Sequence, residues 1–518
     1  MKGFHSTVSR RDFMKSLSLI GAGLGAAAAV SPAFHDLDEA TSSIPAVHPW
    51  PWWVKETDYD VTSVEIDWSK ITRWDSRHIL QCSWQGSKEL DAWVDLRDGA
   101  GTAARLIKER DDRKLTGLKS GDPWYDIRNY ALSAGRWKAT VSNADYFLGT
   151  KVTTPAERGV PNWTGTPEEA SMMLKVAATM YGASDVAIIE LDSNTSKNMI
   201  FSYEFRDGKP YVFEDVDLAY ETGEADVNGR PAKDGKRVIP NKAKWVIQYS
   251  FDESEEWLGR FGEEGGMRYQ TGQHAQPCIQ RFIKSLGYQA IGPMNYTNNM
   301  SENIGMAILG GSSELGRNNL AISPRFGAVQ GQCSSIITDL PLAPTKPIDA
   351  GIHRFCYTCL KCAENCPGGA LSRNGEGPSG ALIKEPTWEG VAPSHRWTGR
   401  TAFEAKTPNV FRQQAGINET AFYKHWWYSV PDCYPGIYDQ CGSFGCCVSC
   451  PFSGGSKSGV HMLVKAAAST TSLLNPLFRS LDDTFYGKEG RIRRTPEQLN
   501  AFWEGKVPLY RFGTDSTL

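Results

Sequence analysis

Apolar residues recur at helical spacing in two segments near the middle of the chain. One helix is predicted over roughly 266–286, because its apolar residues follow the i, i+3, i+4, i+7 spacing of a buried helix face: Ile279, Phe282, Ile283 and Leu286. The other begins at Thr166-Pro167-Glu168-Glu169, which has an N-cap threonine, a first-turn proline and an N3 glutamate. It is predicted to end at Tyr181, and the expected helix caps are Gly182 and Gly287.

Short, mostly apolar runs follow these helices and predict strands at Asp185–Leu191, Trp245–Ser250 and Tyr288–Ile291. Helices that alternate with such strands indicate a layered α/β core over about 165–345. Upstream, helices are predicted around 88–110 and 122–134, in a region rich in Trp, Asp and Arg to which no chemistry can be assigned.

Beyond Leu342 the composition changes to a cysteine-rich segment. Its first group has gaps of two, two and three residues and a proline at the end: Cys356, Cys359, Cys362, Cys366 and Pro367. These are the gaps of a bacterial ferredoxin, in which three thiolates hold one 4Fe–4S cluster and the fourth binds a second cluster. A zinc knuckle or a disulfide cluster is the alternative, but a tetrahedral zinc site does not need spacing this close.

A second cysteine group contains Cys433, Cys441, Cys446, Cys447 and Cys450. Its end, Cys446-x-x-x-Cys450-Pro451, repeats the last third of the first group, whereas Ser443 stands where the preceding ligand is expected. By the ferredoxin rule, one cluster is predicted on Cys356, Cys359, Cys362 and Cys450, and the other on Cys366, Cys433, Cys441 and Cys446. Cys447 remains an alternative to Cys446, because only the gap to Cys450 distinguishes the two.

The N-terminal segment predicts the compartment. Twin arginines in Ser9-Arg10-Arg11-Asp12-Phe13-Met14-Lys15 precede a mild apolar run, Leu19–Val30, and then the small residues Ser31-Pro32-Ala33. This is the pattern of a Tat export signal, and the apolar run is too short to span a bilayer. We therefore expect a protein on the outer face of the cytoplasmic membrane, attached to it peripherally.

The 518 residues carry a formal net charge of −3 and contain no long basic run, which argues against nucleic acid as a partner. A chain of this length exceeds one small core. The predicted divisions are a signal peptide at 1–33, an N-terminal region at 34–164 that packs on the core, the core at 165–345, a cysteine-rich domain at 346–460 with an insert at 367–432, and a tail at 461–518.

Over nearly its whole length the chain resembles the respiratory corrinoid-dependent reductive dehalogenases of the chloroethene type. The resemblance rests on the Tat segment, the two cysteine groups and, between them in order, residues 279–290, 314–324 and 338–342. It implies an α+β fold, with a nitroreductase-like layered core that binds a cobalamin-type corrinoid base-off, followed by a ferredoxin-like domain with two 4Fe–4S clusters. It also implies removal of halide from an organohalide at reduced cobalt, an electron donor at the membrane and a small integral-membrane anchor subunit.

Replacing a C–halogen bond by C–H takes two electrons and one proton, and a tyrosine can supply the proton if a nearby cation stabilises the phenolate. The resemblance implies the catalytic residues Tyr269, Asn295 and Arg317, with Arg325 as the alternative arginine. Each also has a structural interpretation, as core lining, as a turn residue or as a partner of Glu314. The family pattern has a further basic residue where this chain has Gln330-Gly331-Gln332, so the hold on one side of the corrinoid is unassigned.

Two other functions fit parts of the pattern. An epoxyqueuosine reductase-like enzyme would share the corrinoid and the clusters but act on tRNA in the cytoplasm, which the twin arginines and the charge balance argue against. A non-catalytic iron–sulfur electron-transfer subunit would not need an α/β core of this size. The favoured hypothesis is therefore an exported terminal reductase of organohalide respiration.

Overall fold

The computed structural model describes residues 50–59, 61–71, 73–78, 84–137, 147–204, 207–223, 235–258, 267–293, 300–366, 370–371, 426, 433, 445–453, 459–488 and 495–506. The predicted signal segment, Asn295, Cys441 and nearly all of the insert at 367–432 lie outside these residues. Within them, no helix combines the length and the apolar composition that crossing a bilayer requires.

Four strands form the central sheet in the order β2-β6-β10-β7, and each neighbouring pair is antiparallel. Their bounds are Asp185–Glu190 for β2, Trp245–Asp252 for β6, Gln330–Thr338 for β10 and Ala290–Ile291 for β7. The register aligns Ile188, Ile247 and Ile336 across the sheet. The three predicted strands are confirmed, although β7 is shorter than the run that predicted it.

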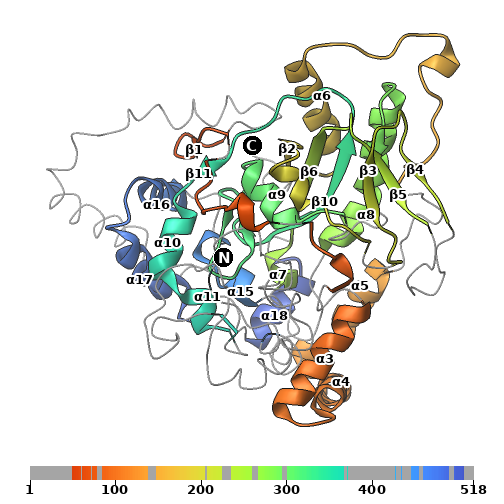
Figure 1. Ribbon diagram of the computed structural model, residues 1–518. Helices are drawn as coiled ribbons and strands as arrows, with labels where there is room; N and C mark the ends of the chain where they lie inside the picture. The colour runs from red at the N-terminus through yellow and green to blue at the C-terminus, as the bar shows by residue number, and fades with distance from the viewer. Residues whose placement is uncertain are drawn as a thin grey trace, which may run out of the picture.

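The two faces of this sheet bury different side chains, because side chains alternate along a strand. On β2, Val186 and Ile188 pack on the side covered by helices α6 (Pro167–Met180) and α8 (Met267–Ser285). Ala187 and Ile189 belong to the other face, which α9 (Asn303–Leu309) covers. The core is therefore three layers of helix, sheet and helix, as the alternation of elements predicts (Figure 1).

Helices α6 and α8 confirm their predictions. Thr166 and Glu169 form the expected capping box, and Gly182 and Gly287 follow the two helices. The single helix predicted around 88–110 is wrong: the chain forms α3 (Trp84–Asp98) and α4 (Thr102–Ser120), because Gly99 and Gly101 take left-handed backbone angles that interrupt a helix. The helix predicted at 122–134 begins later, as α5 (Ile127–Trp137), after a 3-10 turn at Pro123–Tyr125.

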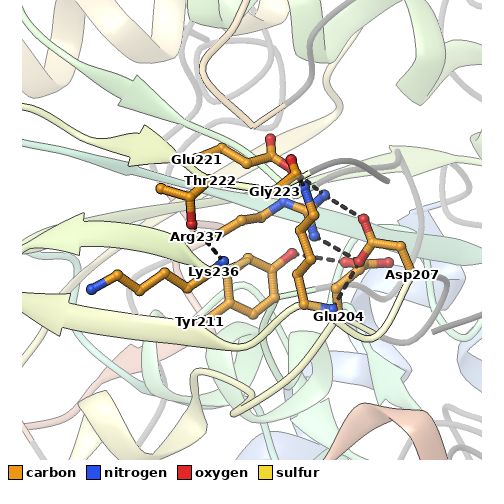
Figure 2. Close-up of polar contacts among 9 residues, drawn as sticks. Glu204, Asp207, Tyr211, Glu221, Thr222, Gly223, Lys236 and Arg237 are labelled. Atoms are coloured by element: carbon orange, nitrogen blue, oxygen red, sulfur yellow. Dashed lines mark hydrogen bonds and ion pairs between the residues drawn. The ribbon is translucent and has the colours of Figure 1, made fainter. Parts of the chain in front are cut away.

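A smaller sheet of β3 (Tyr211–Glu214), β5 (Arg237–Pro240) and β4 (Tyr220–Glu221) carries a buried ionic cluster, which Figure 2 shows. The fully buried Arg237 guanidinium binds both oxygens of Asp207, at 2.9 and 2.5 Å, and Glu221 at 2.9 Å. Lys209 binds Glu221 at 2.6 Å, and the Tyr211 phenol donates to Glu204 at 2.7 Å. Arg237, Asp207, Lys209 and Glu221 are therefore each paired with an opposite charge.

The cysteine-rich segment forms a second helical unit (left in Figure 1). It contains α10 (Ile352–Cys359), α11 (Lys361–Glu364), α15 (Gly445–Val448), α16 (Gly459–Thr470) and α17 (Asn475–Tyr486). Because α16 and α17 pack against α10, the predicted tail belongs structurally to this unit. Arg479 of α17 donates to the Cys359 carbonyl at 2.7 Å, and Lys361 binds Asp482.

Short elements join the unit to the rest of the chain. Strand β1 (Lys55–Glu56) pairs with β11 (Ile348–Asp349), and β8 (Glu314–Leu315) pairs with β9 (Ala321–Ile322). Leu258 at the end of α7 (Glu255–Leu258), Val329 and Val448 of α15 form a small apolar cluster between the core and the cysteine-rich unit. Helix α18 (Pro496–Trp503) lies against the N-terminal helices, where Trp503 donates to Asn129 of α5.

Candidate metal centre and proton-donor site

Helix α10 begins where a buried carboxylate meets its first turn. Glu314, at the start of β8, accepts hydrogen bonds from the backbone N–H of Ala350 at 3.1 Å and of Ile352 at 2.9 Å. A carboxylate at a helix N-terminus satisfies N–H groups that otherwise lack partners. The helix ends at Cys359, and the left-handed residue Leu360 turns the chain into α11. This turn brings three cysteines of the first group to one place.

Four thiols line one cavity: Cys356, Cys359, Cys362 and Cys450. The fourth comes from the second cysteine group, just beyond α15, so the geometry agrees with the crossing-over expected of a ferredoxin. Phe355 and Phe452, whose rings meet edge to face at 5.3 Å, help to close the cavity on its apolar side. That these thiols bind a cluster stays a prediction.

The donor set fits a cluster better than a single ion. Four sulfurs on one zinc would lie roughly 3.8 Å apart, given Zn–S bonds of about 2.3 Å. Among the described residues, no group of three or more His, Cys, Asp or Glu side chains is arranged to hold one ion, whereas the four thiols surround a cavity. Burial raises the pKa of the Cys356 thiol to about 11 and that of Cys450 to about 12, so only a metal would deprotonate them at neutral pH.

A guanidinium lines the same cavity. Arg317, almost fully buried, donates from Nε to the Cys356 carbonyl at 3.0 Å and from Nη2 to the Tyr357 carbonyl at 3.5 Å. Its guanidinium carbon lies 5.1 Å from the ring centroid of Trp426. The alternative arginine, Arg325, instead stacks on Trp50 at 4.3 Å.

The remaining cysteines of the prediction are less completely placed. Helix α15, which carries Cys446 and Cys447, packs against α11 near Cys366. The pKa of the Cys446 thiol is raised well above its ordinary value, first by the adjoining Cys447 thiol and then by burial. Cys433 is half-buried, and Cys441 lies outside the described residues. The structure therefore leaves the choice between Cys446 and Cys447 open.

The predicted proton donor stands beside a different arginine from the one predicted. Tyr269, in the first turn of α8, accepts a hydrogen bond on its phenol oxygen from Nη2 of Arg268 at 3.0 Å. Nη1 of Arg268 binds the buried Glu253 at 2.7 Å. The stem of Arg268 crosses β10 at Gly331, where an added Cβ would lie 1.8 Å from Cδ of the arginine. Gly331 thus leaves room for the stem of Arg268. A basic side chain therefore lies over residues 330–332, which include no basic residue of their own.

Helix α8 also buries a row of glutamines on the side that carries Tyr269. Gln273, Gln276 and Gln280 follow Tyr269 at helical spacing and are buried. Gln276 donates to the Pro293 carbonyl, two residues before Asn295. The Oε1 atoms of Gln273 and Gln276 have no hydrogen-bond partner within the described part of the chain. A ligand with amide N–H donors, as a corrinoid has at its edge, would satisfy such atoms.

Sequence reasoning did not find Arg268, Glu314 as a helix cap, or Trp426. Arg268 directly precedes Tyr269, but consecutive side chains on a helix point in different directions. Their adjacency in the sequence therefore did not predict that they would interact. Trp426 lies in the insert, more than 50 residues along the chain from Cys356 and Tyr357, whose carbonyls bind the same arginine. Only the tertiary fold brings these groups together.

Comparisons with known proteins cover both units. Residues 50–342 match the family described as Dehalogenase, reductive dehalogenase subunit. The chain is 27% identical to the chloroethene reductive dehalogenase of Dehalococcoides mccartyi strain VS, over 99% of each chain, and 28% identical to the trichloroethene reductive dehalogenase of another strain of that species, over 98% of each.

Solved structures agree on the fold. A variant of the catabolic reductive dehalogenase NpRdhA matches with a TM-score of 0.54 and 15% identity, over 88% of this chain and 52% of that chain. A structure described as suggesting a mechanism for B12-dependent dehalogenation matches with a TM-score of 0.50 over 85% of this chain and 49% of that one. The chain thus spans about half the length of these structures and shares their mixed α+β fold.

Proposed function

This chain belongs to the reductive dehalogenase family, and on that premise we propose that it removes a halogen, as halide, from a small organohalide and puts hydrogen in its place. Chlorinated ethenes are the proposed substrate class, because both relatives that match over nearly the full length are named for such substrates. The observation that carries the proposal is the four-thiol cavity beside a core that matches this family.

Electrons are proposed to enter through two 4Fe–4S clusters in a ferredoxin-like domain. Cys356, Cys359, Cys362 and Cys450 would hold the first, and their common cavity supports this set. The second would be held by Cys366, Cys433, Cys441 and Cys446. Two such clusters close together pass single electrons, and the reaction needs two.

The layered core is proposed to be nitroreductase-like and to hold a cobalamin-type corrinoid base-off. When bound, this group supplies a reduced cobalt, which is the centre at which the C–halogen bond is broken. Gln273 and Gln276 would bind the amide groups at its edge, which supports the fit of the site. One of the solved structures that share this fold is described as that of an enzyme of B12-dependent dehalogenation, which supports the same cofactor.

Tyr269 is proposed as the proton donor and Arg268 as its cation. The C–halogen bond breaks, two electrons and one proton reach the carbon, and the halide leaves. The phenolate of Tyr269 then remains next to the guanidinium, 3.0 Å from Nη2, which stabilises it. We assign Arg268 rather than Arg317 to this role, because the hydrogen bonds of Arg317 run to Cys356 and Tyr357. Asn295, which lies outside the described residues, is kept as the catalytic amide that the resemblance implies.

We further propose that the protein is exported by the Tat route and held at the outer face of the cytoplasmic membrane. Its partners there would be a small integral-membrane anchor subunit and a membrane electron donor. The twin arginines of Ser9–Lys15 support export.

The experiment that tests the function uses purified, chemically reduced protein and a panel of tetrachloroethene, trichloroethene, a chloroethane and a chlorinated aromatic. We expect chloride release and the matching hydrogenated product from the ethenes. Protein that contains iron, sulfide and corrinoid but releases no halide from any member of the panel would contradict the proposal.

A further inference from the structure

We propose that Arg317 raises the reduction potential of the first cluster by holding a positive charge beside it. The inference rests on the proposed function for the presence of that cluster on Cys356, Cys359, Cys362 and Cys450. It gives Arg317 the role of a positioning and tuning residue for electron transfer, in place of the proton-transfer role that the sequence predicted.

The position of Arg317 is the first argument. It follows β8 and reaches the cavity that the four thiols line, where its side chain is 1% exposed. Its Nε–H donates to the carbonyl of Cys356, one of the four cysteines, at 3.0 Å. The guanidinium is therefore fixed to the backbone of the ligand helix, and Arg317 lines the same cavity as the four cysteines.

The second argument is that the guanidinium cannot easily turn away. The centroid of the Trp426 ring lies 5.1 Å from its central carbon, and Trp426 is itself fully buried against His353 and Tyr357, at ring-centroid distances of 4.7 and 5.5 Å. Asn319 donates to the Trp426 carbonyl at 2.9 Å. A planar, stacked and hydrogen-bonded cation is the geometry for which arginine is suited and lysine is not.

Charge in the surroundings is the third argument. The cations on α10, α11 and α17 are paired: Arg354 with Asp349, Lys361 with Asp482 and Asp483, and Arg479 with Glu364 and Asp483. Burial lowers the pKa of His353 to about 4, so this imidazole is neutral at physiological pH. The carbonyls that Arg317 binds are dipoles and leave its positive charge in place.

The direction of the effect follows from charge. A 4Fe–4S cluster becomes more negative when it takes up an electron, so a buried cation beside it stabilises the reduced form. Burial also lowers the pKa of Arg317, but a guanidinium stays protonated in proteins. Removing the charge should therefore make the first cluster harder to reduce and leave the second cluster unchanged.

The test is a redox titration of the anaerobic holoprotein, followed by EPR of the reduced clusters, on wild type, Arg317→Gln, Arg317→Lys and Arg325→Gln. In Arg317→Gln we expect the ratio of reduced to oxidised first cluster at a fixed potential to fall at least tenfold, equivalent to a downward shift of about 59 mV for one electron. Arg325→Gln is the matched control, since it removes a buried arginine stacked on a different tryptophan, and it should move neither midpoint.

Each outcome has a consequence. Unchanged midpoints in Arg317→Gln, with full iron content, would overturn the inference and leave the proposed function intact. If Arg317→Gln loses iron, Arg317→Lys decides: iron retained there with a first-cluster midpoint near that of wild type supports the inference, whereas a midpoint shifted downward despite the retained charge, or iron lost in both variants, counts against it and gives Arg317 a folding role. Wild-type protein without iron–sulfur signals would refute both the proposed function and this inference.

Discussion

Arg268 donates a hydrogen bond from Nη2 to the phenol oxygen of Tyr269 at 3.0 Å, and its other terminal nitrogen binds Glu253 at 2.7 Å. The carboxylate thus orients the guanidinium, and the guanidinium stands where a phenolate would form. Because the charge is held before any proton moves, little reorganisation is required when the tyrosine ionises. Two predictions test this pair.

Substituting Tyr269→Phe removes the phenol and keeps the ring. We expect halide release to fall by at least about 100-fold, the lower end of what a positioned general acid contributes, while corrinoid and iron contents stay at the wild-type level. Product analysis with metal and absorption measurements checks this. Full turnover by the phenylalanine variant would eliminate Tyr269 as the proton donor.

Substituting Arg268→Gln keeps a donor near the phenol and removes the charge. We expect a lower kcat, with a pH optimum for kcat shifted upward, because the phenolate loses its stabilising cation. Arg281→Gln on the exposed side of the same helix is the control and should behave like wild type. An unchanged pH profile in Arg268→Gln would show that Arg268 only fills space over Gly331.

The thiol assignments predict a pattern of cluster loss. The wild-type protein should contain about eight irons and one cobalt. Cys450→Ser should disturb the first cluster and Cys441→Ser the second, whereas Cys447→Ser should spare both. EPR of the reduced variants measures this. Loss of a cluster in Cys447→Ser but not in Cys446→Ser would show that Cys447, and not Cys446, is the ligand.

Glu314 predicts how stability depends on pH. Burial raises the pKa of its carboxyl from 4.5 to about 7, so the folded chain holds this proton more tightly than the unfolded chain. The stabilisation, roughly 3 kcal/mol, is complete below pH 4.5 and is lost as the pH rises to about 7. Urea unfolding midpoints of wild type and Glu314→Gln across this range provide the check: the glutamine variant should lack this component of the slope.

The ionic cluster of the small sheet predicts a large destabilisation. Arg237→Met should cost roughly 3–5 kcal/mol, because the buried Asp207 would lose its cation while Glu221 would keep only Lys209. Lys108→Ala, which removes an exposed ion pair with Asp112, should leave the unfolding midpoint close to that of wild type. Equal unfolding midpoints for the two variants would contradict this interpretation.

The sequence predicted best those elements whose formation depends on residues close together in the chain. The capping box of Thr166 and Glu169 and the apolar face of α8 are local signals, and the structure contains both elements at nearly the predicted bounds. The break between α3 and α4 was not predicted, although its cause is local: Gly99 and Gly101 take left-handed backbone angles. Helices α16, α17 and α18, which the described residues form beyond the last cysteine, were not predicted either.

The candidate site likewise contains parts that residue spacing predicts and parts that depend on the tertiary fold. Spacing and the ferredoxin rule were enough to group Cys450 with Cys356, Cys359 and Cys362, which now share a cavity. Spacing could not pair Arg268 with Tyr269 or bring Trp426 to Arg317, because these contacts depend on side-chain direction and on segments far apart in the chain.

Helix α17 comes after every cysteine in the chain, yet it holds the first cysteine group in place: Arg479 donates to the Cys359 carbonyl, and Asp482 binds Lys361. A ribosome must therefore finish most of the chain before Cys359 has its support. The proposed cluster would therefore gain this support only once α17 has been translated, and a polypeptide that ends before α17 would lack it.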